Sequence, residues 1–126
     1  MAEKIFFDVQ ALNPHVKMIC GSFCPNGSSA VDNDSNTGTG FTVARGGTGS
    51  FTVTLDAKYP GLLSGQCSLA LNAVADSKVQ FGAIDVASAK TVVINVITTA
   101  SAADIAANAN NRIHFCLFLR NTSLTK

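Results

Sequence analysis

The chain has 126 residues and a mass of 13.0 kDa, which is the size of one domain. Charged residues make up 13% of it and hydrophobic residues 47%, which excludes an intrinsically disordered chain. The net charge is +1, and Lys and Arg form no run, so we expect no nucleic-acid partner. So few charges on a small domain predict that part of its surface is covered by other protein.

No stretch of the chain reaches the roughly 18–20 apolar residues of a membrane span, so no membrane partner is expected. Near the N-terminus only Ile5, Phe6 and Phe7 follow one another before an acid, too few for the apolar core of a secretion signal. We therefore expect synthesis in a reducing cytoplasm. Free thiols are then predicted for all four cysteines, Cys20, Cys24, Cys67 and Cys116, and the most plausible disulfide, should one form, joins Cys20 to Cys24.

In chain order, the sequence is a series of short runs with a two-residue period, which is typical of strands with one buried face. Thr, Val, Ile and Phe dominate these runs and suit a pleated surface. About eight short strands predict an all-β fold, namely an antiparallel β-sandwich of the jelly-roll or immunoglobulin-like kind, formed by a single domain over residues 1–126. The runs are residues 5–9, 16–20, 41–43, 51–55, 67–73, 79–83, 92–97 and 113–120.

Two stretches between these runs are predicted to be loops. Residues 21–40 form one long polar loop, and a loop of this length is usually functional or mobile. Residues 100–111 are rich in Ala and Asn but have no apolar stripe at helical spacing, so we expect a loop there rather than a helix.

One hairpin can be predicted in register, because the triplet Phe-Thr-Val occurs at residues 41–43 and again at 51–53. Val43 opposite Val53 matches apolar side chains on one face, whereas a slip of one residue would place them opposite threonines. The turn is expected inside the glycine-rich stretch 46–50, whose glycines allow positive φ angles.

Two apolar segments are candidates for an interface. An N-terminal arm, residues 1–9, contains Ile5, Phe6 and Phe7 and suits contact with a neighbouring subunit, although the same alternation fits an ordinary first strand. The last run is apolar on both faces. Its odd-numbered side chains should enter the core, while Phe118, on the even face, is either buried in mid-sheet or used as an interface.

No catalytic, metal-binding or cofactor-binding motif stands in the sequence, so we expect no enzyme activity and no cofactor. His114 shares a strand face with Cys116, but we interpret it as an imidazole on a sheet surface rather than as a general base. Residues 32–36 begin like a calcium loop, but Thr37 stands where that loop has Gly and Val43 where it has Glu.

Three segments, Gly47–Leu63, Lys78–Ile94 and Ala103–Asn121, together resemble small virion proteins of tailed bacteriophages. The resemblance is to capsid decoration (cement) proteins in particular, including those of cyanophages, and covers residues 38–123. It implies a β-sandwich, often a homotrimer, that is assembled in the host cytoplasm and sits on the outer capsid surface of the virion. There it would bind the major capsid protein and stabilise contacts between neighbouring capsid subunits.

An alternative function uses the same fold. A tail fibre, spike or tail-tip domain that recognises a host surface would also be β-rich and trimeric, and the polar loop 21–40 would then be its recognition loop. A hydrolase with an unrecognised site is a third class, disfavoured because no nucleophile stands at a suitable spacing from a base. Binding to purified capsids or to host cells separates the first two.

Overall fold

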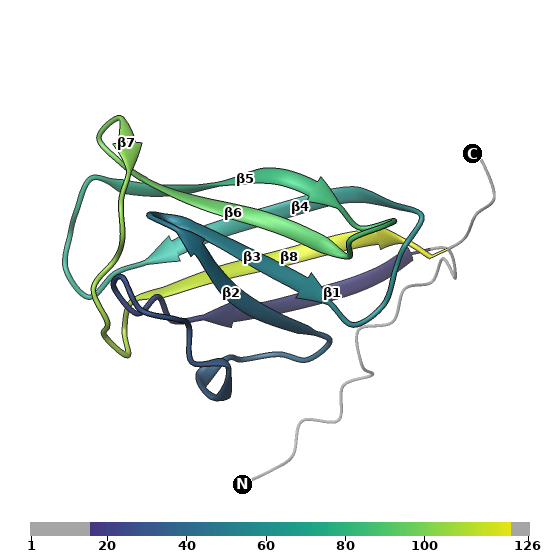
Figure 1. The fold of residues 1–126 in the computed structure, drawn as a ribbon, viewed down its shortest axis with the longest axis horizontal. Helices are drawn as coiled ribbons and strands as arrows, with labels where there is room; N and C mark the ends of the chain where they lie inside the picture. The colour runs from purple at the N-terminus through teal and green to yellow at the C-terminus, as the bar shows by residue number, and fades with distance from the viewer. Residues whose placement is uncertain (1–15, 122–126) are drawn as a thin grey trace, which may run out of the picture.

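The computed structural model describes residues 16–121. β-Strands account for nearly all the regular structure, and all strand pairs are antiparallel. The elements are β1 (Val16–Phe23), the short 3₁₀ turn η1 (Asn33–Ser35), β2 (Phe41–Gly47), β3 (Ser50–Leu55), β4 (Gly61–Ala70), β5 (Ser77–Asp85), β6 (Thr91–Thr98), β7 (Ser101–Ala102) and β8 (Arg112–Arg120) (Figure 1).

The strands form two sheets that pack face to face (Figure 1). One sheet has three strands in the order β1-β8-β4. The other has the order β2-β3-β6-β5, and the two-residue strand β7 adds to β6. The predicted antiparallel β-sandwich is therefore confirmed.

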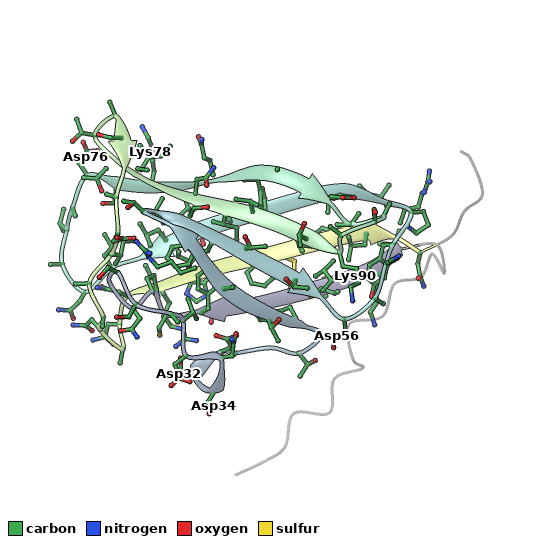
Figure 2. All side chains as sticks on the ribbon, in the orientation of Figure 1. Asp32, Asp34, Asp56, Asp76, Lys78 and Lys90 are labelled. Atoms are coloured by element: carbon green, nitrogen blue, oxygen red, sulfur yellow. A yellow bond between two sulfur atoms is a disulfide. The ribbon has the colours of Figure 1, made fainter. Side chains whose placement is uncertain are left out.

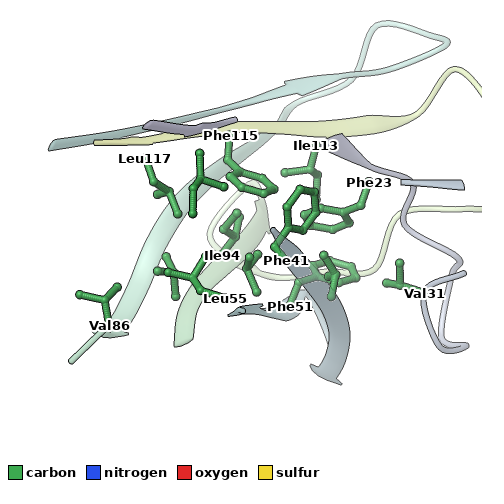
Figure 3. Close-up of a cluster of buried hydrophobic side chains, with 14 of the residues drawn as sticks. Phe23, Val31, Phe41, Phe51, Leu55, Val86, Ile94, Ile113, Phe115 and Leu117 are labelled. Atoms are coloured by element: carbon green, nitrogen blue, oxygen red, sulfur yellow. The ribbon is translucent and has the colours of Figure 1, made fainter. Parts of the chain in front are cut away.

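The core lies between the sheets and is built from side chains that alternate along each strand. In β8 the odd-numbered residues point inward, as predicted. Phe115 of β8 meets Phe41 of β2 edge-on, with ring centroids 4.8 Å apart (Figure 3). Full burial of such a side chain contributes about 1.5–3 kcal/mol to stability. The most deeply buried apolar side chains are Phe23, Phe51, Val53, Leu55, Val92, Ile94, Val96, Ile113, Leu117 and Leu119.

The β2–β3 hairpin has the predicted register. Val43 lies opposite Val53 and Phe41 opposite Leu55, with all four side chains buried. The turn falls inside the glycine-rich stretch, as expected. A register shift between Arg45 and Gly47 accommodates one extra residue, Gly46, which has no partner in β3.

Gly49 in this turn cannot be replaced without strain. Its φ angle is +62°, and a Cβ at this position would stand 2.7 Å from the carbonyl oxygen of Val96 and 2.7 Å from the backbone nitrogen of Ala103. The Gly49 N–H donates to Asp104 Oδ1 (3.0 Å), and Arg45 Nη2 lies 2.8 Å from Asp104 Oδ2. The hydrogen bonds from Arg45 and from the Gly49 backbone lower the pKa of Asp104 below its ordinary value.

The stretch expected to be a polar loop at 21–40 is shorter and more ordered than predicted. The predicted start at residue 21 is wrong, because β1 continues to Phe23, whose side chain is fully buried. Val31 is also buried, and its contacts with the core hold the middle of the stretch in place. Asp32, at the start of the calcium-like sequence, accepts a hydrogen bond from the Asp34 N–H (3.0 Å) and so caps η1.

Residues 100–111 contain β7 but no helix, in line with the predicted loop. Within residues 16–121, no helix is long and apolar enough to cross a membrane.

The first and last described strands are neighbours, since Val16 lies opposite Arg120. β1 therefore begins and β8 ends at the same end of the sandwich (Figure 1). Figure 2 shows Asp76 and Lys78 at one end of the molecule, Asp56 with Lys90 at the other, and Asp32 with Asp34 at the lower edge of the view, on the segment between β1 and β2.

Candidate interaction surface

The outer face of the three-stranded sheet carries an exposed group of large apolar side chains. Met18 of β1 lies opposite Phe118 of β8, which lies opposite Ser64 of β4. A bulge in β4 just before Ser64 turns Leu63 outward, and its side chain is 55% exposed. Met18 is 36% exposed, and Phe118 is half-buried between its two neighbouring strands. We call Met18, Leu63 and Phe118 the Met18 patch.

The strand order explains why Phe118 stays partly accessible. β8 is the central strand of its sheet, so its outward side chains have neighbours on both sides but no layer above them among the described residues. Phe118 thus lies in mid-sheet, as one alternative predicted, but is only half-buried, and its use as an interface stays a prediction. The other three residues of the predicted interface, Ile5, Phe6 and Phe7, lie outside the described residues.

Charge on this face has one sign. The outward positions of β1, β4 and β8 contain no carboxylate. Arg112 and Arg120 lie at the two ends of β8, with the exposed His114 between them. The remaining outward residues are neutral, so the surface is apolar around Met18 and Phe118, toward the Arg120 end, and has cations only along β8.

A disulfide crosses the same face. Cys20 of β1 and Cys116 of β8 are directly opposed in the register and are joined, with their Cα atoms 4.2 Å apart. The prediction of four free thiols is therefore wrong for this pair, and so is the predicted alternative that joined Cys20 to Cys24. The physical reason is the strand pairing, which brings together two residues 96 positions apart in sequence.

Cys24 and Cys67 remain free. Cys67 points inward from β4, opposite Phe115, and burial raises the pKa of its thiol. Because Cys116 is in the disulfide, it has no thiol to pair with His114, which agrees with the interpretation of that histidine as a surface side chain.

Arg112 fixes the polar end of the face through contacts with neutral groups. Its guanidinium donates to Ser22 Oγ (3.0 Å), to Cys24 Sγ (2.9 Å), to the Ser35 carbonyl oxygen (3.0 Å) and to Thr37 Oγ1 (3.1 Å). These bonds tie residues 22–37 to the last strand. Arg112 thus adds to the burial of Val31 in holding this segment against the sandwich.

A cavity of about 330 Å³ lies beside Arg112. Polar groups from two loops and from β8 line it, among them Asn26, Asp32, Ser35 and Asn108. Within residues 16–121, no three side chains of His, Cys, Asp or Glu gather as a metal site would require.

Sequence reasoning missed two members of the Met18 patch for different reasons. Residues 16–20 alternate, but both faces of that run carry apolar side chains, so the pattern does not say which face is buried. For Leu63, the adjacent residues Leu62 and Leu63 were a usable signal, because two neighbours in a strand point to opposite faces. One of the two leucines must then face outward unless the strand is buried on both sides.

Comparisons of the chain with protein-family models, with curated proteins and with solved structures give no match to any of them. The geometry of the surface and the chemistry of its residues therefore carry the functional argument.

Proposed function

We propose that this protein is a structural component of a tailed-bacteriophage virion, a decoration protein that binds the outer face of the capsid as a homotrimer and stabilises contacts between major capsid subunits. The observation that carries the proposal is the Met18 patch, a group of exposed apolar side chains on a rigid sheet. The resemblance of three sequence segments to capsid decoration proteins directs it to this class of partner.

The energetics favour association through this face. Full burial of a fully exposed large apolar side chain contributes about 1.5–3 kcal/mol. Met18 is 36% and Leu63 55% exposed, so covering the Met18 patch contributes a fraction of that value for each side chain. Three copies around an axis match the threefold positions of an icosahedral shell, and simultaneous binding multiplies weak contacts into avidity. Because the Met18 patch is apolar, binding should tolerate salt.

The test compares two matched variants. Phe118→Ser removes an outward side chain from the central strand of the three-stranded sheet. Val93→Ser removes one from β6, an inner strand of the other sheet, where Val93 also faces outward and is half-buried. Light scattering should give three times 13.0 kDa for the wild-type protein and for Val93→Ser, but less for Phe118→Ser.

Capsid binding supplies the second half of the test. Wild-type protein added to purified particles that lack it should raise the temperature at which they lose their genome, and Phe118→Ser should have little effect. A monomer that leaves particle stability unchanged would contradict the proposal.

A host-recognition domain of a tail fibre, spike or tail tip is the second candidate, and the cavity beside Arg112 favours it. Its wall combines amide, carboxylate and hydroxyl groups with apolar atoms of Pro25, Ala107 and Ala109, as in sites that bind small ligands. Asn108→Ala removes an amide group from the lining of this cavity, and Asn108 is exposed, so the fold should tolerate the change. If the protein serves adsorption, this variant should reduce attachment of particles to host cells while leaving their thermal stability unchanged.

A further inference from the structure

The main chain of β1 has hydrogen-bonding groups that point away from β8. The Ser22 N–H donates to the carbonyl oxygen of Thr37 (2.8 Å), and the Thr37 N–H donates to the carbonyl oxygen of Ser22 (2.9 Å). Both groups of Ser22 therefore face the outer edge of the sheet. In an antiparallel pair this orientation recurs at every second residue. The backbone N–H and carbonyl groups of Cys20, Met18 and Val16 therefore face the same edge.

Toward the start of β1 this edge is open. Among residues 16–121, no backbone hydrogen bond reaches the outward groups of Val16, Met18 or Cys20. Gly38 packs against the Cys20 carbonyl oxygen, since a Cβ on Gly38 would stand 2.5 Å from it, so the accessible groups are those of Val16 and Met18. β1 pairs with β8 without a register shift over its whole length, whereas β4 and β5 both contain bulges. A straight strand with unpaired groups is the geometry to which another strand can add.

A groove of about 440 Å³ runs along this edge. Residues 17–20 of β1 form one wall, and residues 38–40 with Asp56 and Tyr59 form the other. Gly38 and Gly40 have positive φ angles and no side chains, so neither residue places a side chain in the groove. The groove thus offers main-chain partners on one side and room for side chains on the other.

We propose that this groove is a strand-addition site that receives residues 5–9 of a second copy of the chain. The inference rests on the proposed homo-oligomer and names the contact that would hold it together. The Met18 patch consists of only three side chains, whereas stable protein interfaces bury about 1,000 Å² or more. A trimer therefore needs contacts beyond the patch.

Residues 5–9 fit the groove in pattern, charge and reach. Ile5, Phe7 and Val9 alternate with Phe6 and Asp8, which suits an extended segment with two different faces. Lys4 and Asp8 flank the aromatic pair, and the groove offers one charge of each sign, from Lys17 and Asp56. Residues 10–15, which join this segment to Val16, can span up to about 20 Å.

One variant can block the groove without breaking the sheet. Met18→Pro removes an N–H that points away from β8, so the β1–β8 ladder keeps its bonds, and proline is tolerated at such edge positions. Met18→Val removes the same side chain but keeps the N–H. By light scattering, self-association of Met18→Pro should weaken about tenfold or more relative to Met18→Val, with both folded by circular dichroism.

A mixing experiment identifies the occupant. Phe7→Asp damages the arm and leaves the groove intact, whereas Met18→Pro damages the groove and leaves the arm intact. Each variant alone should be monomeric, and an equimolar mixture should form dimers with one copy of each by native mass spectrometry. Failure of the mixture to associate would overturn the proposal, because an arm that binds its own copy cannot complement another.

The two proposals fail in different ways. If Met18→Pro and Phe7→Asp both remain trimeric while Phe118→Ser dissociates, strand addition is wrong and the decoration function stands. If the mixture forms the expected dimers but the wild-type protein binds no capsid, strand addition stands and the decoration function is wrong.

Discussion

Two of the edge strands, β1 and β2, are held in place by different interactions. At β2 the side chain of Asn33 acts as a substitute strand, with Nδ2 donating to the Val43 carbonyl oxygen (3.0 Å) and Oδ1 accepting from the Val43 N–H (2.8 Å). At β1 the outer edge is bonded only at Ser22 among the described residues, and the strand is instead joined to β8 by the Cys20–Cys116 disulfide.

Blocking the outer edge of a strand and bonding the strand to its inner neighbour have different consequences. An open edge invites pairing with other chains, and a side chain that occupies its bonding groups prevents it. A covalent bond to the inner neighbour holds a strand in place and leaves its outer groups unoccupied. The edge of β2 is thus blocked at Val43 by a side chain, whereas β1 is held from its inner side and has no side chain across its outer edge at Val16 or Met18 within residues 16–121, which is the combination that a strand-addition site needs.

The largest effect should come from breaking the covalent attachment of β1. Replacing Cys20 and Cys116 together by Ala should lower the free energy of unfolding by about 2–4 kcal/mol, because a crosslink over a long loop restricts the unfolded chain. Chemical denaturation measures the loss, and Cys67→Ala is the control. Thiol titration of the denatured wild-type protein should find the two free cysteines, Cys24 and Cys67, before reduction; four thiols would contradict the disulfide.

The turn that ends β2 should be the next most sensitive point. Gly49→Ala should cost about 3 kcal/mol, since it combines a left-handed backbone with a clash against main-chain atoms. Gly27 has nearly the same φ angle, +59°, but a Cβ added there would meet nothing within 4 Å, so Gly27→Ala should cost only about 1 kcal/mol. Equal losses in thermal denaturation would mean that crowding at Gly49 is unimportant.

Opening the β2 edge should have an intermediate effect. Asn33→Ala leaves the N–H and carbonyl of Val43 without their partner and should cost about 1–2 kcal/mol. The newly exposed edge should also increase concentration-dependent aggregation. Asn26→Ala, which removes one exposed hydrogen bond to Ala30, is the control and should change stability by about 0.5 kcal/mol. Unchanged stability and solubility of Asn33→Ala would remove the distinction between the two edges.

The smallest effect should be the acid dependence of the turn beside β2. The lowered pKa of Asp104 means that its contribution is complete above about pH 4 and is lost as the pH falls through the folded-state pKa. Asp104→Asn should therefore flatten the decrease in stability in acid. Asp56→Asn serves as the control, because Asp56 has no ion pair within residues 16–121. An acid profile unchanged by Asp104→Asn would show that its bonds to Arg45 and Gly49 do not contribute.

Patterns that depend on neighbouring residues could be predicted from the sequence. The alternation in residues 51–55, 92–97 and 113–120 predicts strands that the structure places in the core. The β2–β3 register follows from matching Val43 with Val53, because only one pairing buries both. Pairings between distant segments could not be predicted in this way, and β8 between β1 and β4 is the main example.

The candidate surface was predictable only in part for the same reason. The parity of β8 places Phe118 opposite the core face, which the sequence shows directly. That Met18 and the disulfide lie on the same surface depends on β1 pairing with β8, and the groove depends on where main-chain groups point. Neither property leaves a signal in side-chain composition.

The Cys20–Cys116 disulfide also determines how the molecule responds to force. It joins the first and last described strands at the middle of their ladder, and it closes a ring that contains β2 to β7. Tension between residues 16 and 120 would be carried by this covalent bond once residues 16–19 of β1 had separated from residues 117–120 of β8. After reduction of the disulfide, the same tension would separate β1 from β8 along their whole length, one residue pair after another.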